Sequence, residues 1–214
     1  MKIKSLLSAL FSLPKTIYVN FRYLPLAQAI KLPVWCHWNS WVTGDGELIV
    51  DKPQTASIRL GSASSKFPSQ RFALCLTGVL RFKGAASIGT GTKMLIEGNL
   101  TVGERFACSG GGIIDCKAES TFGDDVLIGH CCNFMDCDGH PVMIDGVVIN
   151  EDAGYHIGNH VWLGRECLVL KGTNTCDDIV FGARSVVSGN YPVRNAIYVG
   201  SPAKLKKENI TWRH

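Results

Sequence analysis

Charged residues and long hydrophobic runs are both scarce in this chain of 214 residues. Charged residues make up 19% of it and the net charge is +4, too small a positive excess to indicate a nucleic-acid-binding protein. No stretch approaches the ~18–20 apolar residues that a membrane-spanning helix needs. Hydrophobic residues nevertheless make up 46% of the chain, which is enough apolar material for a folded core.

Cysteine pairs spaced as in structural zinc sites are also missing, although the chain has nine cysteines. The number is odd and the positions are spread along the chain, which favours small buried residues in a reducing compartment over a disulfide framework. Pro14, Lys15 and Arg22 interrupt the first apolar stretch well before Ala27-Gln28-Ala29, a tripeptide that resembles a cleavage site. We therefore expect no cleaved signal peptide and a cytoplasmic location.

Acidic residues are absent from positions 2–31, whose basic residues are Lys2, Lys4, Lys15, Arg22 and Lys31. The stretches SLLSALFSL and LPLAQAIKL predict two short amphipathic helices around KTIYVNFRY, so that residues 1–40 form an N-terminal helical segment. Two interpretations of this segment are open. It either caps a neighbouring domain or contacts another subunit, or it lies on an anionic membrane surface. The second interpretation would place the protein at the inner face of a membrane.

A bulky residue recurs every six positions in the C-terminal half of the chain. The series runs through Ile157, Leu163, Val169, Thr175, Phe181 and Val187. The same step gives Phe122, Ile128 and Phe134 upstream and, after a slip of two residues, Ile96, Val102, Cys108 and Ile114. Glycine follows several of these positions, and small or β-branched residues lie four positions after them.

A period of six residues fits neither an α-helix nor a heptad repeat. It fits a parallel coil of short strands, in which one bulky residue per strand points into a shared core and small residues occupy the corners. Three such faces make one coil of about eighteen residues, which buries its core only against the next coil. We therefore predict an all-β fold, a parallel β-helix over residues 41–193, with a basic tail at 194–214.

Three stretches resemble the left-handed β-helix acyltransferases, the hexapeptide-repeat proteins that include maltose, galactoside and xenobiotic acetyltransferases and the O-acetyltransferases of surface-polysaccharide clusters. They are HIGNHVWLGRECLVLKG (156–172), IVFGARSVVSGNYPVRNAIYVGSPAKLKK (179–207) and DGHPV (138–142). The resemblance implies a triangular prism with left-handed coils, although parallel connections between strands are normally right-handed. It also implies a homotrimer, acetyl-CoA as acyl donor in the cleft between neighbouring prisms, and a histidine base on a protruding loop.

The six-residue series stops at Phe134 and resumes at Ile157, which predicts a loop over 135–156 that leaves the coil. His140 lies in this loop, and an imidazole with a pKa near the working pH suits the removal of a proton from an attacking hydroxyl. A carboxylate at the other ring nitrogen would orient the ring. The candidates are Asp138 and Asp136, nearest in sequence, and Asp145 and Glu151 from later in the loop.

Two other interpretations of the loop have to be weighed. His140 is a polar turn residue ahead of Pro141 if the repeat and the motif are ignored. A metal site is the other interpretation, with ligands from His130, Cys131, Cys132, Cys137 and His140. The repeat, the loop position and the motif together favour a catalytic base, and the missing cysteine pairs lead us to expect no metal.

The resemblance also assigns residues that bind acetyl-CoA. Gly164, Gly182 and Ala183 match positions that line the pantetheine arm, and Trp162 matches the aromatic residue near the thioester, with a subunit contact as its alternative. The other matches are Arg165 and Ser188, which correspond to cofactor contacts, and Lys204 and Lys207, which correspond to basic positions for the phosphates. Arg165 replaces a residue that is often small, and Gly189 replaces a common lysine. The alternative for the two lysines is a solvated basic tail.

These features predict an acetyl-CoA-dependent O-acetyltransferase that acts on a sugar hydroxyl in surface polysaccharide biosynthesis, by direct transfer with a histidine general base. N-acetylation of an amino sugar or another amine is an alternative on the same scaffold. A second alternative is a non-catalytic hexapeptide-repeat protein that assembles or binds metal. The sequence says almost nothing about the acceptor.

Overall fold

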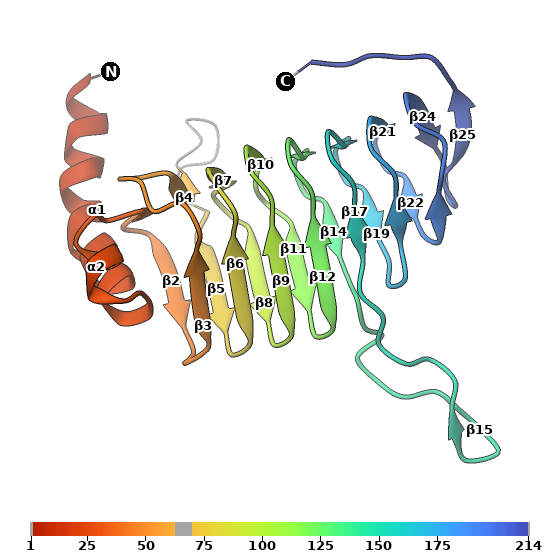
Figure 1. Cartoon of the computed structure of the whole chain (residues 1–214), viewed down its shortest axis with the longest axis horizontal. Helices are drawn as coiled ribbons and strands as arrows, with labels where there is room; N and C mark the ends of the chain where they lie inside the picture. The colour runs from red at the N-terminus through yellow and green to blue at the C-terminus, as the bar shows by residue number, and fades with distance from the viewer. Residues whose placement is uncertain (1, 63–69, 214) are drawn as a thin grey trace.

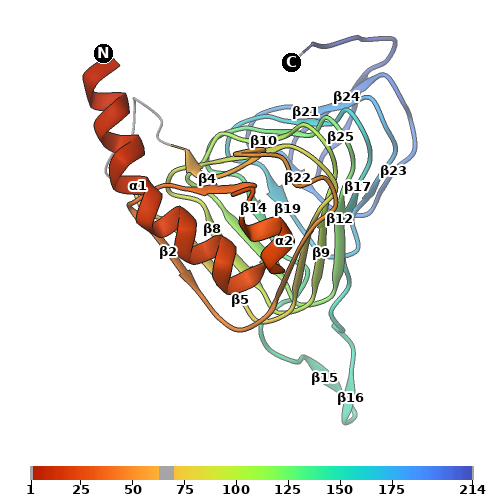
Figure 2. The same ribbon diagram turned by 60° about the vertical axis from the view of Figure 1, so that its left-hand side comes forward.

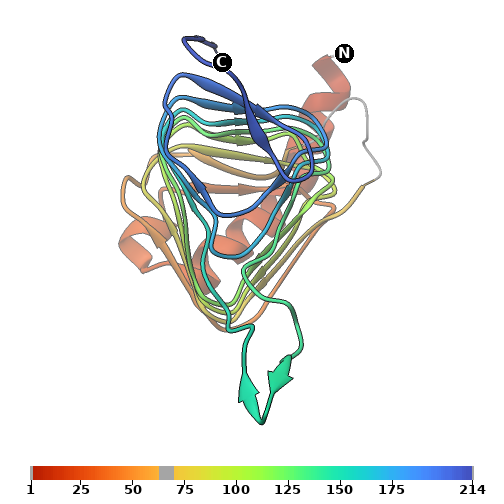
Figure 3. The same ribbon diagram turned by 90° about the vertical axis from the view of Figure 1, so that its right-hand side faces the viewer.

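Three parallel sheets form the faces of a triangular prism in this computed structural model, which describes residues 2–62 and 70–213 (Figure 1, Figure 3). Sheet A contains β1 (Val34–Cys36), β4 (Ile58–Ser62), β7 (Ala86–Gly89), β10 (Phe106–Cys108), β13 (Leu127–Ile128), β18 (Trp162–Leu163), β21 (Ile179–Phe181), β24 (Ala196–Val199) and the antiparallel β25 (Lys204–Lys207). Sheet B contains β2 (Ser40–Thr43), β5 (Phe72–Leu76), β8 (Lys93–Ile96), β11 (Ile113–Cys116), β14 (Asn133–Phe134), β19 (Leu168–Val169) and β22 (Val186–Val187). Sheet C contains β3 (Glu47–Val50), β6 (Val79–Phe82), β9 (Asn99–Val102), β12 (Glu119–Phe122), β17 (His156–Ile157), β20 (Asn174–Thr175) and β23 (Asn190–Tyr191).

The chain passes through the sheets in the order A, B, C and then returns to sheet A one layer further along. Seen from the N-terminal end, this path turns counter-clockwise while the chain moves away from the viewer (Figure 2), so the coil is left-handed. The predicted parallel β-helix is therefore confirmed, with the handedness that the resemblance implied.

The length of a coil changes along the prism. Leu163 pairs with Phe181 after the loop, a shift of eighteen residues, whereas Val102 pairs with Phe122 before it, a shift of twenty. The two additional residues of the earlier coils lie between sheets B and C, and they account for the slip in the six-residue series. The protruding loop leaves the prism at this same B–C edge, between the end of β14 and the start of β17.

The repeating bulky residues form the core. Ile157, Leu163, Val169, Phe181 and Val187 are all buried, while Thr175 is partly exposed. A column of aromatic rings crosses the middle of the prism, with centroids 5.1 Å apart for Phe106 and Phe122, 5.0 Å for Phe122 and Phe134, and 5.4 Å for Phe134 and Tyr155. This column packs the last residue before the loop against Tyr155 at its end.

The N-terminal segment differs from the expectation. One continuous helix, α1 (Lys2–Tyr23), includes KTIYVNFRY and is followed by the single turn α2 (Leu26–Ala29). Pro14 lies within α1. It is exposed, so water can reach the carbonyl group that proline leaves without a donor. The coil begins with β1 at Val34, earlier than the expected boundary at 41. Of the helices that the structure describes, none is long and apolar enough to cross a membrane.

Antiparallel strands occur in two places, in the protruding loop and at the C-terminal end of the prism. Within the loop, β15 (Met143–Ile144) and β16 (Val147–Val148) form a hairpin that projects from the B–C edge (Figure 3). Asp145 and Gly146 make its turn with positive φ angles of 48° and 79°. At the other end, β24 and β25 extend sheet A, so part of the expected basic tail belongs to the sheet.

Candidate active site

Asp136 fixes the base of the protruding loop. Its side chain is completely buried, and its carboxylate accepts hydrogen bonds from the Lys117 N–H at 2.8 Å, the Ala118 N–H at 3.0 Å and the Ser120 hydroxyl at 3.0 Å. The same hydroxyl accepts a hydrogen bond from the N–H of Tyr155, at the other end of the loop. Asp136 therefore ties both ends of the loop to the preceding coil.

This placement corrects the suggestion that Asp136 orients His140. The carboxylate is directed into the corner of the coil and is occupied by three donors, whereas the His140 side chain is exposed on the loop. A buried acceptor of this kind stabilises a corner whose backbone N–H groups would otherwise lack partners. Asp136 is therefore a structural residue of the loop base.

Asp138 belongs to a second network, on the outer side of the loop. Its carboxylate accepts hydrogen bonds from the Lys171 ammonium group at 2.6 Å and from the Asn150 side-chain amide at 2.9 Å. The hydrogen bond from Lys171, with help from Asn150, lowers the pKa of Asp138. Asp138 is thus directed towards Lys171, and not towards the imidazole ring that sequence reasoning paired it with.

Asn150 and Lys171 hold the two strands of the loop together. The Asn150 amide donates to the backbone carbonyl of His140 at 2.9 Å and accepts from the N–H of Val142 at 2.6 Å. The Lys171 ammonium group also donates to the carbonyl groups of Asn150 at 2.8 Å and Glu151 at 3.1 Å. Side chains therefore fix the backbone on both sides of His140, and none of these hydrogen bonds involves the imidazole ring.

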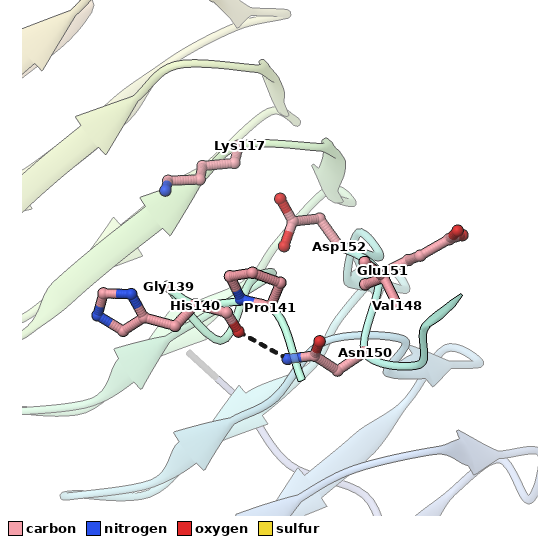
Figure 4. Close-up of a pocket in the computed structure, with 8 residues that line it drawn as sticks. All are labelled: Lys117, Gly139, His140, Pro141, Val148, Asn150, Glu151 and Asp152. Atoms are coloured by element: carbon pink, nitrogen blue, oxygen red, sulfur yellow. Dashed lines mark hydrogen bonds between the residues drawn. The ribbon is translucent and has the colours of Figure 1, made fainter. Parts of the chain in front are cut away.

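The His140 ring lines a pocket of about 270 Å³ at the B–C edge (Figure 4). The ring lies on the side of the loop opposite Asn150, with the Lys117 side chain across the pocket from it. Within residues 2–62 and 70–213, no side chain forms a hydrogen bond with either ring nitrogen. Both nitrogens are therefore available to a molecule that enters the pocket.

Several acidic residues of the loop are not aligned with the His140 ring. Asp145 lies in the turn of the hairpin at the far end of the loop. Glu151 lines the pocket, but its side chain extends away from the ring, while the carboxylate of Asp152 is directed towards the space below Lys117 (Figure 4). Within the described chain, no carboxylate takes the orienting role that a triad would require.

The predicted acyl-donor wall lies on a different edge. Gly164 and Gly182 follow β18 and β21 at the A–B edge, one above the other, and the N–H of Gly164 donates to the carbonyl of Phe181 at 2.8 Å. A Cβ atom on Gly164 would lie 2.6 Å from the backbone nitrogen of Ala183, so glycine is required here for the close stacking of the coils. Arg165 is at the same edge, and its carbonyl accepts the N–H of the next coil. Gly164, Arg165, Gly182 and Ala183 therefore do lie together.

The remaining predicted contacts are spread over the C-terminal coils. Ser188 lies exposed at the B–C edge, on the same edge as the loop, and its N–H donates to the Tyr191 hydroxyl at 2.9 Å. Lys204 and Lys207 are exposed on β25. About six residues of extended chain separate Gly164 from the B–C edge, or roughly 20 Å. One chain thus places His140 and the glycine wall on separate edges of sheet B.

Trp162 has an unexpected neighbour. Its exposed ring lies 5.9 Å from the ring of Trp212, which in turn stacks on His160 with a centroid distance of 4.1 Å and an interplanar angle of 6°. The Trp212 indole N–H donates to the carbonyl of His160 at 3.1 Å, and the His160 ring is 3.0 Å from Asp178. The C-terminal segment is therefore anchored over sheet A beside Trp162.

The cysteines and histidines of the hypothetical metal cluster are separated by their packing. All nine cysteines are free thiols. Cys132 is buried and its thiol donates to the carbonyl of Gly164 at 2.9 Å, while Cys131 is exposed. Among the described residues, no group of three or more histidine, cysteine or acidic side chains is arranged to hold a metal ion.

Sequence reasoning missed Lys171, Asn150 and Trp212. Lys171 lies within the stretch that carries the family resemblance, but its partner Asp138 is 33 positions away, and no spacing rule connects them. Asn150 follows an exposed apolar hairpin, where a polar residue is expected anyway. An exposed histidine with a fixed backbone in a pocket can accept a proton from a bound hydroxyl group.

Comparison with known proteins gives several partial matches, although no family model matches the chain. A polysialic acid O-acetyltransferase from Neisseria meningitidis is 33% identical over 98 residues, which are 45% of this chain and 46% of that protein. A polysialic acid O-acetyltransferase from Escherichia coli O1:K1 / APEC is 30% identical over 134 residues, which are 62% of this chain and 42% of that protein. These matches span less than half of either relative.

Among solved structures, the polySia-specific acetyltransferase NeuO superposes with a TM-score of 0.65 at 22% sequence identity. The superposition covers 84% of this chain and 74% of that one. A likeness at this level of identity shows the β-helix fold alone.

Proposed function

We propose that this chain is an acetyl-CoA-dependent O-acetyltransferase acting on a sugar hydroxyl, as a member of the left-handed β-helix, hexapeptide-repeat acyltransferases that its fold and its partial sequence matches resemble. The acceptor is a surface polysaccharide or a precursor of one, because the matched curated relatives are named as polysialic acid O-acetyltransferases. The free thiols of all nine cysteines suit a cytoplasmic location, where disulfides are rare.

His140 is the general base in this proposal. A ring nitrogen takes the proton of the sugar hydroxyl while the oxygen attacks the thioester carbonyl carbon of acetyl-CoA. The tetrahedral intermediate then collapses, the carbon–sulfur bond breaks, and the imidazolium returns its proton to the leaving thiolate. The observation that carries the proposal is the free His140 ring in a pocket, on a loop whose backbone is held by Asn150 and Lys171.

The separation of the two edges supports a site between subunits. His140 projects from the B–C edge, whereas the glycine wall that would accept the pantetheine arm lies at the A–B edge, roughly 20 Å away across sheet B. A homotrimer in which the loop of one prism faces the A–B edge of its neighbour would unite them. Lys204 and Lys207 on β25 would then attract the phosphates of acetyl-CoA as point charges.

The test is thiol release from acetyl-CoA by the purified protein with nucleotide sugars, lipid-linked sugars, free sugars and amino sugars as acceptors. We expect release with a hydroxyl acceptor and a loss of about 10²–10⁴ in turnover for His140→Ala. His156→Ala is the matched control, because His156 is also exposed but lies on β17 outside the pocket. Near-full activity of His140→Ala would reject the base assignment, and release only with amino sugars would replace O-acetylation by N-acetylation.

A further inference from the structure

The helix α1 packs on the prism with a polar face. The Thr16 hydroxyl donates to the carbonyl of Cys36 at 3.2 Å and accepts its N–H at 3.0 Å, and the Asn20 amide makes the same pair of bonds with Val34 at 2.7 and 3.1 Å. β1 is the end strand of sheet A and has only β4 beside it. Side chains of α1 therefore satisfy backbone groups that a further coil would otherwise pair, which protects the exposed edge of the sheet.

The opposite face of α1 is apolar and exposed. Its members, which we call the outer face, are Leu7, Leu10, Phe11, Ile17, Tyr18 and Phe21. Phe11 is 68% exposed, whereas the packed residues Ser12, Thr16 and Asn20 are at most 1% exposed. A surface helix normally buries its apolar stripe and exposes its polar one, and α1 departs from this pattern, although its apolar residue Val19 is also buried.

Basic residues border the outer face. Lys15 and Arg22 are seven positions apart, so they lie along one side of the helix, and residues 2–31 contain no acidic residue. On the opposite side of α1, burial raises the pKa of Tyr23, a residue packed against the core, and the nearby carboxylate of Asp45 adds to the rise. The exposed apolar surface is thus accompanied by positive charge.

A pocket of about 460 Å³ lies where this basic border meets the prism. Its walls include the side chains of Lys15, Tyr18, Trp38, Trp41 and Arg71. Trp38 and Trp41 are 51% and 57% exposed, and the Lys15 ammonium group lies 5.9 Å from the centre of the Tyr18 ring. Two cations among three exposed aromatic rings suit an anionic group at the boundary between water and an apolar phase.

We propose that the outer face of α1 docks on an anionic lipid bilayer, with Lys15 and Arg71 binding a lipid phosphate in this pocket. The apolar side chains would enter the acyl region while Lys15 and Arg22 stay among the headgroups. A second copy of the chain is a poorer occupant, because pairing two such faces would bring like charges together. The inference concerns binding alone and stands independently of the proposed acetyl transfer.

Cosedimentation with vesicles tests the docking. We expect the full-length protein to bind vesicles of phosphatidylcholine mixed with phosphatidylglycerol, to bind phosphatidylcholine vesicles weakly, and to dissociate as the salt concentration rises. Lys15→Gln with Arg71→Gln removes two charges and should weaken binding about 25-fold, at about fivefold per charge. Phe11→Ser with Phe21→Ser should weaken binding about tenfold or more.

The matched control is Lys83→Gln with Leu95→Ser, which removes one exposed charge and one exposed apolar side chain away from α1 and should bind as the wild type does. All of these side chains are at least partly exposed, and circular dichroism would verify that each variant is folded. Equal binding to both kinds of vesicle, or wild-type binding by both α1 variants, would overturn the proposal. A smaller assembly in the Phe11/Phe21 variant without lipid, together with no vesicle binding by the wild type, would assign the face to a subunit contact and also overturn it.

Tryptophan quenching gives a second measurement that needs no weakened variant. In a protein whose Trp35, on β1 beneath α1, is replaced by phenylalanine, brominated phosphatidylglycerol should quench Trp38 and Trp41, which line the pocket with Lys15 of α1, and spare Trp162 and Trp212. Trp38→Phe with Trp41→Phe should then lose most of the quenching. Persistence of the quenching in that variant would place the lipid contact elsewhere and contradict the proposed face.

Discussion

The two edges of sheet B are built by different means in the coils after the loop. At the A–B edge, a Cβ atom on Gly164 would lie 2.6 Å from the backbone nitrogen of Ala183, and one on Gly182 would lie 2.6 Å from a side-chain carbon of Val199. At the B–C edge, Gly172 and Gly189 have positive φ angles and nothing within 4 Å of an added Cβ atom. The first edge is therefore closely packed against the next coil, whereas the second has open space around its glycines.

The coils before the loop show separately that the B–C edge accommodates additional residues. The coils before it already contain two additional residues at this corner, so the corner accepts longer connections without disturbing the hydrogen bonds of either sheet. Side-chain networks around Asp136 and Lys171 then fix the loop. The same repeat thus forms a closely packed glycine wall at one edge and carries an inserted loop at the other.

The largest expected effect comes from Asp136→Ala. The substitution leaves the N–H groups of Lys117 and Ala118 and the Ser120 hydroxyl without their acceptor in a buried corner, which should lower the free energy of unfolding by about 3–5 kcal/mol. Chemical denaturation measures this change. Asp152→Ala is the control, an exposed carboxylate of the same loop whose loss should change stability by less than about 0.5 kcal/mol. Similar stabilities for the two variants would show that Asp136 does not anchor the loop base.

A smaller effect is expected at the A–B edge. Gly164→Ala places a methyl group against the backbone of Ala183 and should destabilise the protein by about 1–3 kcal/mol. Gly172→Ala meets open space at the B–C edge and should cost about 1 kcal/mol, from its positive φ angle alone. Thermal unfolding compares the two variants. If Gly172→Ala were the more damaging, stacking would not be what distinguishes the edges.

Much of the fold could be predicted from the sequence, because the same pattern of one bulky core residue every six positions recurs many times. Each bulky residue at a six-residue step is weak information, but Leu163, Val169 and Phe181 all have to point into one core. The handedness did not follow from spacing and came from the resemblance. The break at Phe134 located the loop because a regular series makes an insertion visible. The single helix α1 was not expected, because the two separate apolar stretches predicted two short helices.

The site was less predictable than the fold. His140 could be named because it lies in a recognisable motif within the break. Its surroundings could not, because sequence proximity suggested Asp136 and Asp138 as partners while the structure directs both carboxylates elsewhere. Side-chain direction at a corner depends on which donors the next coil presents. Lys171 supplies those donors to Asp138 from another coil, and nothing local in the sequence indicates that contact.

The smallest predicted effect separates positioning of the loop from orientation of the ring. Asp138→Asn weakens the contact with Lys171 and should lower kcat/KM by about three- to tenfold, whereas loss of a carboxylate that orients a catalytic histidine costs about 10⁴ in kcat. Lys171→Met should have a similar effect, and the double variant should be little worse than either, since one contact is lost in all three. A 10⁴-fold loss confined to Asp138→Asn would restore Asp138 as the partner of His140.

The same contact has a pH signature. Because Lys171 and Asn150 lower the pKa of Asp138, the ionised carboxylate stabilises the loop above the ordinary carboxyl pKa of about 3.9, and this support is lost as the pH falls through the lowered value. Hydrogen exchange at the Val142 N–H, which is bonded to Asn150, reports on the loop. We expect its protection to decrease below about pH 4 in the wild type and to be pH-independent over that range in Asp138→Asn, after correction for intrinsic exchange. Equal acid sensitivity in both proteins would show that the titrating group is not Asp138, and that its contact with Lys171 does not hold the loop at the B–C edge.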